Sequence, residues 1–196
     1  PNVTVTTITL TNNITTGAGL TVSTALIGTG GLTQGTNAVL TIGGTSTVTT
    51  LTATTSGNTV NYNANGAKAA CKVTTYNNLT LSVAGIKTFA TTPTVNGILS
   101  IEGTATVVAT TGVVTYGANA TLQYNTTTAR TSTAEEWITP FAATGGIIIA
   151  STGAITPDAA KVFNASVPLT INSGATLATN NLGLTLGGNF VNGGTF

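Results

Sequence analysis

The chain has 196 residues, of which 41% are hydrophobic and 5% are charged, with a formal net charge of +1. An average globular domain carries about 25% charged residues, and five scattered basic residues do not make the positive surface that nucleic acids and anionic membranes require. The longest apolar run, at 147–150, is far shorter than the ~20 residues of a membrane-spanning helix. Threonine fills about a quarter of the chain, with 48 residues beside 24 Gly and 19 Asn. Thr favours strands and Gly and Asn favour turns, so the composition predicts an all-β protein.

From the N-terminus onward, short segments alternate apolar with polar residues, which is the pattern of a strand with one buried face. These segments are 4–10, 38–44, 78–83, 98–103, 168–174 and 182–188. Each is followed closely by Gly or Asn, the residues that tolerate the positive φ of a tight corner. The spacing of the strand segments therefore predicts many short strands joined by sharp corners.

Several of these segments repeat one another. LTIGGTSTV at 40–48 is identical to LSIEGTATV at 99–107 in six of nine positions, and TTSGNTVNYNANGA at 54–67 resembles TTGVVTYGANAT at 110–121. GLTLGGNF at 183–190 is a third copy of the first phrase. Repeats of this kind are typical of solenoids, in which each unit packs on its neighbour.

The best-matched pair makes specific predictions about side chains. We expect the aliphatic residues of the two copies to point into the same core, and these are Leu40, Ile42, Val48, Leu99, Ile101 and Val107. Gly44 and Gly103 are expected at the same corner. Gly43 faces Glu102 in the alignment, and a duplicated active site would keep the carboxylate in both copies. The repeat is therefore interpreted as scaffold.

Two all-β architectures fit this pattern: a parallel β-helix (β-solenoid) and, as the alternative, a β-sandwich of antiparallel strands. The similarity between segments, the shortage of NG and DG hairpin loops, and the Thr and Asn that could form ladders on the outside favour the β-helix. We predict a single β-solenoid over 1–196, with roughly 20–25 residues in each rung and about eight or nine rungs. The segment 129–146 departs from the pattern and is predicted to be a loop excursion over the rod, with Trp137 and Phe141 packed on it.

The phrases TTYNNLTLSVAGIKTF, TPTVNGILSIEGTATV, LTINSGATL and LGLTLGGNFVNGGTF resemble the repetitive exported surface proteins of bacteria. In that family, Y-N-L-T-L-S-x-x-G-x-K-T and T-V-N-G-x-L-x-I phrases recur, and residues 14–196 can be laid on the pattern. The resemblance implies an adhesin-like or fibre-forming parallel β-helix repeat protein. It implies no catalytic residues, because the class is defined by its scaffold.

The residues themselves offer little chemistry. The chain has no His, which excludes a Ser–His–Asp triad, a Cys–His dyad and imidazole metal ligands. The acidic residues are Glu102, Glu135, Glu136 and Asp158, and cleavage of glycans would need two or three carboxylates that converge. Arg130 is expected to form a loop salt bridge with Glu135. We predict that the protein is not an enzyme, with no catalytic, cofactor-binding or metal site and no cofactor.

Cys71 is the only cysteine, so the chain has no intramolecular disulfide. Its neighbours are apolar, and we expect a buried thiol. The low charge is typical of exported surface proteins, and we predict an extracellular or cell-surface location. Because the chain begins with Pro1, we expect either that a leader has been removed or that the chain belongs to a longer array.

Neither end of the sequence has a polar or helical cap pattern. The run 2–11 is strand-like, and 187–196 continues the repeat, so we predict unpaired strand edges, which are templates for another strand. The predicted function is a structural fibre subunit that assembles with copies of itself, end to end or by exchange of the run 2–11. The alternative is an adhesin or glycan-binding rod, in which exposed aromatic residues would contact a glycan or other surface ligand. These aromatic residues are Tyr62, Tyr116, Tyr124 and Trp137.

Overall fold

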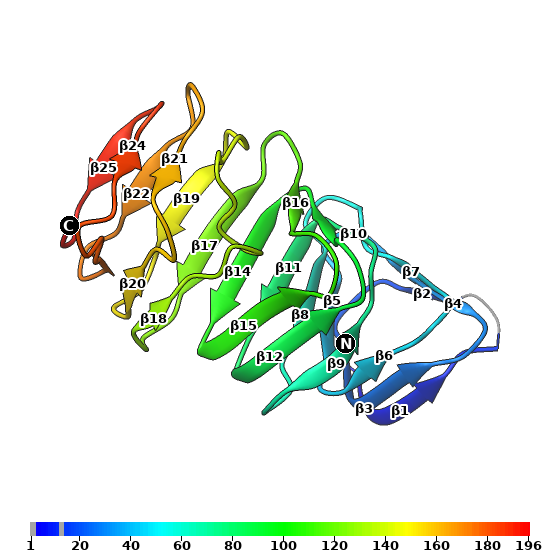
Figure 1. Ribbon diagram of the computed structural model, residues 1–196. Helices are drawn as coiled ribbons and strands as arrows, with labels where there is room; N and C mark the ends of the chain where they lie inside the picture. The colour runs from blue at the N-terminus through cyan, green and yellow to red at the C-terminus, as the bar shows by residue number, and fades with distance from the viewer. Residues whose placement is uncertain (1–2, 12–13) are drawn as a thin grey trace.

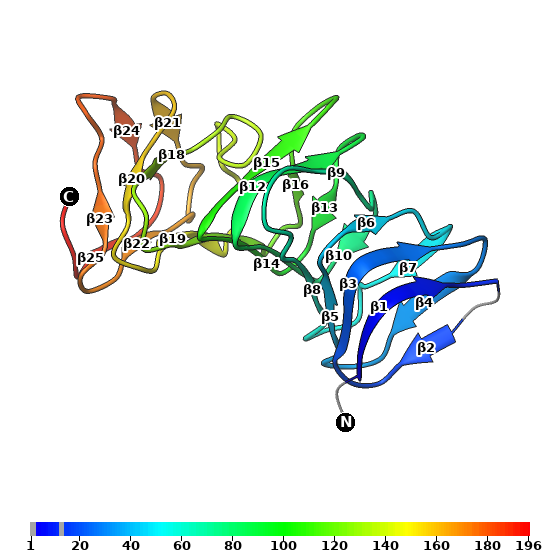
Figure 2. The same ribbon diagram turned by 90° about the horizontal axis from the view of Figure 1, so that it is seen from below.

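The computed structural model describes residues 3–11 and 14–196. In those residues every regular element is a strand, and parallel strands stack into a β-solenoid of about nine turns. Figure 1 shows the strands side by side along the rod, and Figure 2 shows the first and last strands at opposite ends of it. The predicted β-helix is confirmed, and the antiparallel sandwich is excluded because all the strand pairs described are parallel.

Each turn passes through up to three walls, and the first wall is the longest sheet. It follows the order β1-β3-β5-β8-β11-β14-β17-β19-β22-β25, and β6 pairs with β3. The strands are β1 (Val3–Thr9), β3 (Leu20–Ile27), β5 (Val39–Ile42), β6 (Thr45–Ser46), β8 (Thr59–Tyr62), β11 (Asn78–Leu81), β14 (Ile98–Glu102), β17 (Thr121–Asn125), β19 (Gly146–Ile149), β22 (Leu169–Ile171) and β25 (Phe190–Asn192).

The other two walls consist of shorter sheets. The second wall contains β9 (Lys68–Cys71), β12 (Ala84–Phe89) and β15 (Thr104–Ala109), then β18 (Arg130–Thr131), β20 (Ala154–Thr156) and β23 (Thr176–Leu177). The third wall contains β2 (Ile14–Thr16), β4 (Gly31–Gln34), β7 (Thr50–Thr52), β10 (Thr75–Tyr76), β13 (Thr94–Val95), β16 (Thr115–Tyr116), β21 (Lys161–Val162) and β24 (Leu184–Thr185).

The core consists of columns of like side chains, one from each turn. Strand pairing places the inward residues of the first wall directly over one another, because pairing in register keeps every second side chain on the same face. The first column is Val3, Leu20, Leu40, Val60, Leu79, Leu99, Leu122, Ile147, Leu169 and Phe190. Apart from the two residues at the ends, its members are buried.

The repeated phrase has the structural meaning that the sequence predicts. The two copies begin in β5 and β14, which are three turns apart in the first wall, and their aliphatic residues Leu40, Ile42, Val48, Leu99, Ile101 and Val107 are all buried. Gly44 immediately precedes β6, and Gly103 immediately precedes β15, each at the corner that ends the first wall. The third copy is different: its strand β24 lies in the third wall. An apolar strand followed by glycines therefore marks any corner of the rod, and it does not specify a wall.

The segment 129–146 is not a loop lying over the rod, and that prediction is wrong. β18 belongs to the second wall, where it pairs with β20, and Phe141 forms a bridge with Phe163 in the third wall. The side chains of Trp137 and Phe141 are fully buried in the core. The segment is the long part of one turn, which spans 25 residues from Leu122 to Ile147, compared with 17 from Val3 to Leu20.

Threonine hydroxyls connect successive turns by hydrogen bonds to backbone carbonyls. The sequence had suggested ladders between Thr and Asn side chains on the outside of the rod. Thr74 Oγ1 donates to the carbonyl of Leu51 at 3.0 Å, Thr126 Oγ1 to that of Gly103 at 2.5 Å, and Thr144 Oγ1 to that of Ala118 at 3.1 Å. Each hydroxyl satisfies a backbone acceptor of an earlier turn at a corner, where the strand ladder is interrupted. The high threonine content thus supports the corners as well as the strands.

Replacing Gly103 with Ala is expected to destabilise the rod. Gly103 has φ +59°, and an added Cβ would lie 2.2 Å from the carbonyl oxygen of Val83 in the turn below. Strain of this kind costs about 1–3 kcal/mol. Gly17→Ala is the matched control, because no atom lies within 4 Å of the added Cβ. Urea unfolding should show a lower midpoint for Gly103→Ala alone, and equal midpoints would contradict this account of the corner.

Candidate functional site

The four acidic residues do not converge on one another. Glu136 is buried against Arg130, Asp158 pairs with Lys161, and Glu102 accepts a hydrogen bond from Ser100 Oγ at 2.9 Å. Among the described residues no group of three or more His, Cys, Asp or Glu side chains could hold a metal ion. The carboxylates of Glu102, Glu136 and Asp158 thus each have a partner of their own, and no side-chain partner is seen for Glu135 among the described residues.

The buried ion pair differs from the predicted one. Arg130 pairs with Glu136 and not with Glu135, with 2.6 Å between Nη2 and Oε1, and both side chains are nearly inaccessible to solvent. Glu136 Oε1 also accepts hydrogen bonds from Tyr124 Oη at 3.0 Å and from the backbone N–H of Thr133 at 3.2 Å. The turn at 134–136 therefore places the Glu136 carboxylate inside the rod. In a strand, the side chains of Glu135 and Glu136 would instead point to opposite faces.

The charged and polar groups of this cluster are buried and hydrogen-bonded to one another. Burial raises the pKa of Glu136 above its ordinary value, while the Arg130 guanidinium and the hydrogen bond from Tyr124 oppose that rise. Burial, together with the Glu136 charge, raises the pKa of Tyr116 and Tyr124. These groups are enclosed within the rod. A side chain that acts as an acid or base in catalysis needs access to the substrate.

A second polar group lies beside the first, across the next turn. Lys161 is buried, and its Nζ lies 2.8 Å from Asp158 Oδ1 and donates to the carbonyl of Trp137. Ser132 Oγ donates to the same Asp158 oxygen at 2.6 Å. Burial alone would raise the pKa of Asp158, but the hydrogen bonds from Lys161 and Ser132 hold it below its ordinary value. The two groups join consecutive turns in the region where the turns are longest.

A third group surrounds the single cysteine. Cys71 is buried, as predicted. Burial raises the pKa of its thiol to about 12, although the nearby Lys87 ammonium lowers it. Tyr62 and Tyr76 meet in the same part of the core, with 3.2 Å between their hydroxyl oxygens, and the backbone N–H of Lys72 donates to Tyr62 at 2.9 Å.

Lys87 is a buried charge that the sequence reasoning missed. Its side chain is fully buried, and Nζ donates to the carbonyls of Ala64 at 2.7 Å and Ala84 at 2.5 Å. The signal was present in the alternation of AGIKTF, because Lys87 has the same parity as the inward Phe89. The charge of lysine suggested a surface position for Lys87. The alternation of the strand, however, predicts that its side chain points inward.

The aromatic residues that the adhesin alternative requires are not on the surface. Tyr62, Tyr124 and Trp137 are fully buried, and Tyr116 packs against Phe141 with 4.9 Å between ring centroids. Trp137 lies between Tyr124 and Phe163, at centroid distances of 5.9 and 6.2 Å. These four rings therefore do not form the exposed aromatic surface that the adhesin alternative expects, because they lie in the core or pack against it.

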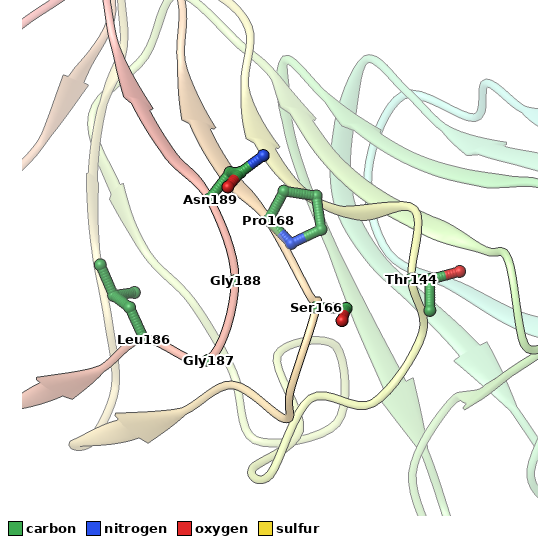
Figure 3. Close-up of a pocket in the computed structure, with 7 residues that line it drawn as sticks. All are labelled: Thr144, Ser166, Pro168, Leu186, Gly187, Gly188 and Asn189. Atoms are coloured by element: carbon green, nitrogen blue, oxygen red, sulfur yellow. The ribbon is translucent and has the colours of Figure 1, made fainter.

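One surface hollow has no side chains suited to acid–base catalysis. It has a volume of about 500 Å³ and lies beside the corners that precede β19, β22 and β25 (Figure 3). It is lined by Thr144, Ser166, Pro168, Leu186, Gly187, Gly188 and Asn189. None of these side chains titrates near neutral pH. The two glycines are there because an added Cβ would lie 2.2 to 2.4 Å from backbone oxygens of the preceding turn, so the hollow follows from rung packing.

The ends of the rod are the remaining candidate site, and both are apolar. On the N-terminal face the inward residues Val3 and Ile14 are exposed, Val3 to 50%. On the C-terminal face Phe190 is 40% and Phe196 57% exposed, and their rings are in contact, with 5.1 Å between centroids. Within the described residues β1 pairs only with β3, and β25 only with β22. The first and last described turns therefore leave apolar side chains of the core columns exposed.

The charges of the chain are confined to its middle. All nine charged side chains lie between Lys68 and Lys161, so 3–11, 14–67 and 162–196 contain none. Natural edge strands are commonly protected from association by Lys, other charges or Pro. β1 and β25 have none of these residues.

The chain matches no protein-family model, no curated protein and no solved structure. The described residues contain no helix with the length and apolar character needed to cross a membrane. The fold therefore assigns the chain to the parallel β-solenoids, and any function must be argued from its own surfaces.

Replacing Glu136 with Gln is expected to destabilise the protein strongly. The substitution keeps the shape of the side chain but leaves the Arg130 guanidinium buried without its counter-charge, which costs about 3–5 kcal/mol. Glu135→Gln, at the partly exposed neighbour, should change stability by no more than about 0.5 kcal/mol. Thermal unfolding of the two variants measures the difference, and a small effect at position 136 would show that the ion pair does not support the fold.

The Cys71 thiol is expected to be unreactive in the folded protein. With a pKa of about 12, roughly one thiol in ten thousand is ionised at pH 8, and the thiolate is the reactive form. A chromogenic disulfide reagent should therefore label the native chain very slowly and label it fully in guanidinium chloride. Complete labelling of the native protein within the mixing time would contradict the buried position.

Proposed function

We propose that this chain is a structural subunit of an extracellular or cell-surface fibre, in which copies stack end to end. The observation that carries the proposal is the parallel stacking of turns, together with the exposed apolar side chains of Val3 and Phe190 in the first and last described turns, which contain no charged residue. A solenoid grows by adding a turn that hydrogen-bonds to the last edge and covers the open core, and the opposite end of another copy offers such a turn. Because the contact joins two different faces, it leaves one of each free and extends without closing.

Stacking of folded ends is favoured over exchange of the N-terminal strand. The run 2–11 was expected as a donated strand, but residues 3–9 form β1, which pairs with β3 of the same chain along its length. Exchange would have to break this pairing first, whereas stacking uses the edge of β1 that is already free. The extracellular location rests on the low charge of the surface and on the resemblance to exported bacterial surface proteins.

The adhesin alternative has less support than the fibre. It depends on aromatic side chains that would stack on sugars, and these are buried. The hollow beside β19, β22 and β25 is lined by polar groups and has no aromatic ring.

Purified chain is expected to form filaments one rod wide in negative-stain electron micrographs. Phe190→Lys should prevent growth, because it places an ammonium group at the inward position of the exposed edge strand, where stacking would bury it. Ile86→Lys is the matched control: Ile86 is 44% exposed in the middle of the rod, close to the 40% of Phe190. Short monodisperse rods from the unmodified chain, or filaments that persist with Phe190→Lys, would contradict the proposal.

A further inference from the structure

The structure also points to a small-molecule site in the middle of the rod, and this inference is independent of the proposed fibre. A hollow with a volume of about 320 Å³ lies where three consecutive turns pass from the second wall to the third. The residues that line it follow β15, β18 and β20, one segment from each turn. We propose that this hollow binds a small, uncharged organic molecule with an apolar body and one hydroxyl group.

The walls of the hollow are mainly apolar. The aliphatic side chains that line it are Val113, Ala134, Ile138 and Ala159, and Val113 is 39% exposed. A bound molecule would remove this apolar surface from water, which is the principal driving force in small-molecule sites. Ligand pockets have volumes of about 300–1,000 Å³, so this hollow suits a ligand at the small end of the range.

Trp137 forms the floor of the hollow and has an unsatisfied hydrogen-bond donor. Its side chain is fully buried and packs against Tyr124 and Phe163. Its indole Nε1 is also buried, yet it has no hydrogen-bond acceptor among the described residues. Buried polar groups nearly always have a partner, and an exception requires an explanation. We assign this donor to an oxygen atom of the bound molecule.

The charges beside the hollow neutralise each other, which selects an uncharged ligand. Lys161 Nζ lies 2.8 Å from Asp158 Oδ1 and 5.8 Å from the centroid of the Trp137 ring. Asp158 and Lys161 both line the hollow. An anion would be repelled by the Asp158 carboxylate and a cation by the Lys161 ammonium. Either ion would also lose its hydration without gaining a counter-charge of its own.

Asp158 offers the second polar contact to a ligand. Its Oδ1 accepts hydrogen bonds from Ser132 Oγ and Lys161 Nζ, and 22% of its side chain is exposed. An ionised carboxylate has about four acceptor positions, so the exposed part can accept another hydrogen bond. A hydroxyl group both accepts and donates. It therefore matches the unpaired N–H of Trp137 and the carboxylate of Asp158.

Binding of phenol and of toluene tests this site, because the two probes differ only in a hydroxyl group that is replaced by a methyl group. Trp137 is the only tryptophan of the chain, so tryptophan fluorescence reports on the floor of the hollow. Phenol should change the emission in a saturable way, after correction for absorption by the probe. Toluene should bind at least about tenfold more weakly, because it leaves the N–H without a partner.

Two alanine substitutions provide a matched pair of variants. Ala159→Leu should abolish the saturable response to phenol, because the larger side chain occupies the hollow that Ala159 lines. Ala160→Leu is the control, since Ala160 is also exposed but is not one of the lining residues. This variant should bind phenol as the unmodified chain does. Because both positions are exposed, the two variants should unfold at the same temperature.

Each outcome decides the inference. A saturable response to phenol that is weaker for toluene and is lost in Ala159→Leu alone supports the site. A response that never saturates overturns it, as does one that persists in Ala159→Leu, which would place phenol elsewhere. Equal binding of toluene overturns the role of the hydroxyl group. These results do not depend on whether the chain forms filaments, so failure of the site and failure of the fibre are separate.

Discussion

Parallel, in-register hydrogen bonding between strands of successive turns is the interaction on which this molecule depends. It fixes the spacing of the turns, and it places like residues over like, so that Leu20, Leu40 and Leu99 fall in one column although they are far apart in the sequence. The corners follow from the same constraint. Backbones of adjacent turns approach so closely that Gly44 and Gly103 have no room for a Cβ, and hydroxyls such as that of Thr74 satisfy carbonyls that the ladder leaves free.

Polar groups inside the rod occur where the turns change in length or direction. Gln34 and Asn58 connect two corners, with Gln34 Nε2 donating to the carbonyl of Ala38 and the Ala38 N–H donating to Asn58 Oδ1. Arg130 and Glu136 occupy the longest turn, which also contains Trp137. Buried ion pairs are costly to desolvate, so they are weak sources of net stability. We interpret this one as fixing how a long segment folds back into the stack, since Glu136 Oε1 joins Arg130, Tyr124 and the backbone of Thr133 at one point.

The sequence predicts the periodic parts of this structure well and the irregular parts poorly. Alternation at 38–44 and 98–103 identifies true first-wall strands, because burial of one face imposes a period of two residues. The phrase at 182–188 has the same local pattern yet lies in another wall, since a strand and its corner look alike wherever they occur. Trp137 and Phe141 were misplaced because their burial depends on contacts with other turns, whereas Lys87 was missed although the local alternation predicts a buried side chain. The pairing of Arg130 with Glu136, and not with its neighbour Glu135, likewise depends on a turn whose conformation the local sequence does not reveal.

The ends connect the architecture to the proposed role. Within the described residues β1 and β25 each pair on one side only, and the absence of charge beyond Lys68 and Lys161 leaves little to oppose association there. The most direct measurement of this account is X-ray fibre diffraction from aligned filaments. Rods that stack end to end place the strand spacing along the fibre, so the account predicts a strong reflection at about 4.8 Å on the meridian. A 4.8 Å reflection on the equator would mean that rods associate side by side, and would contradict it.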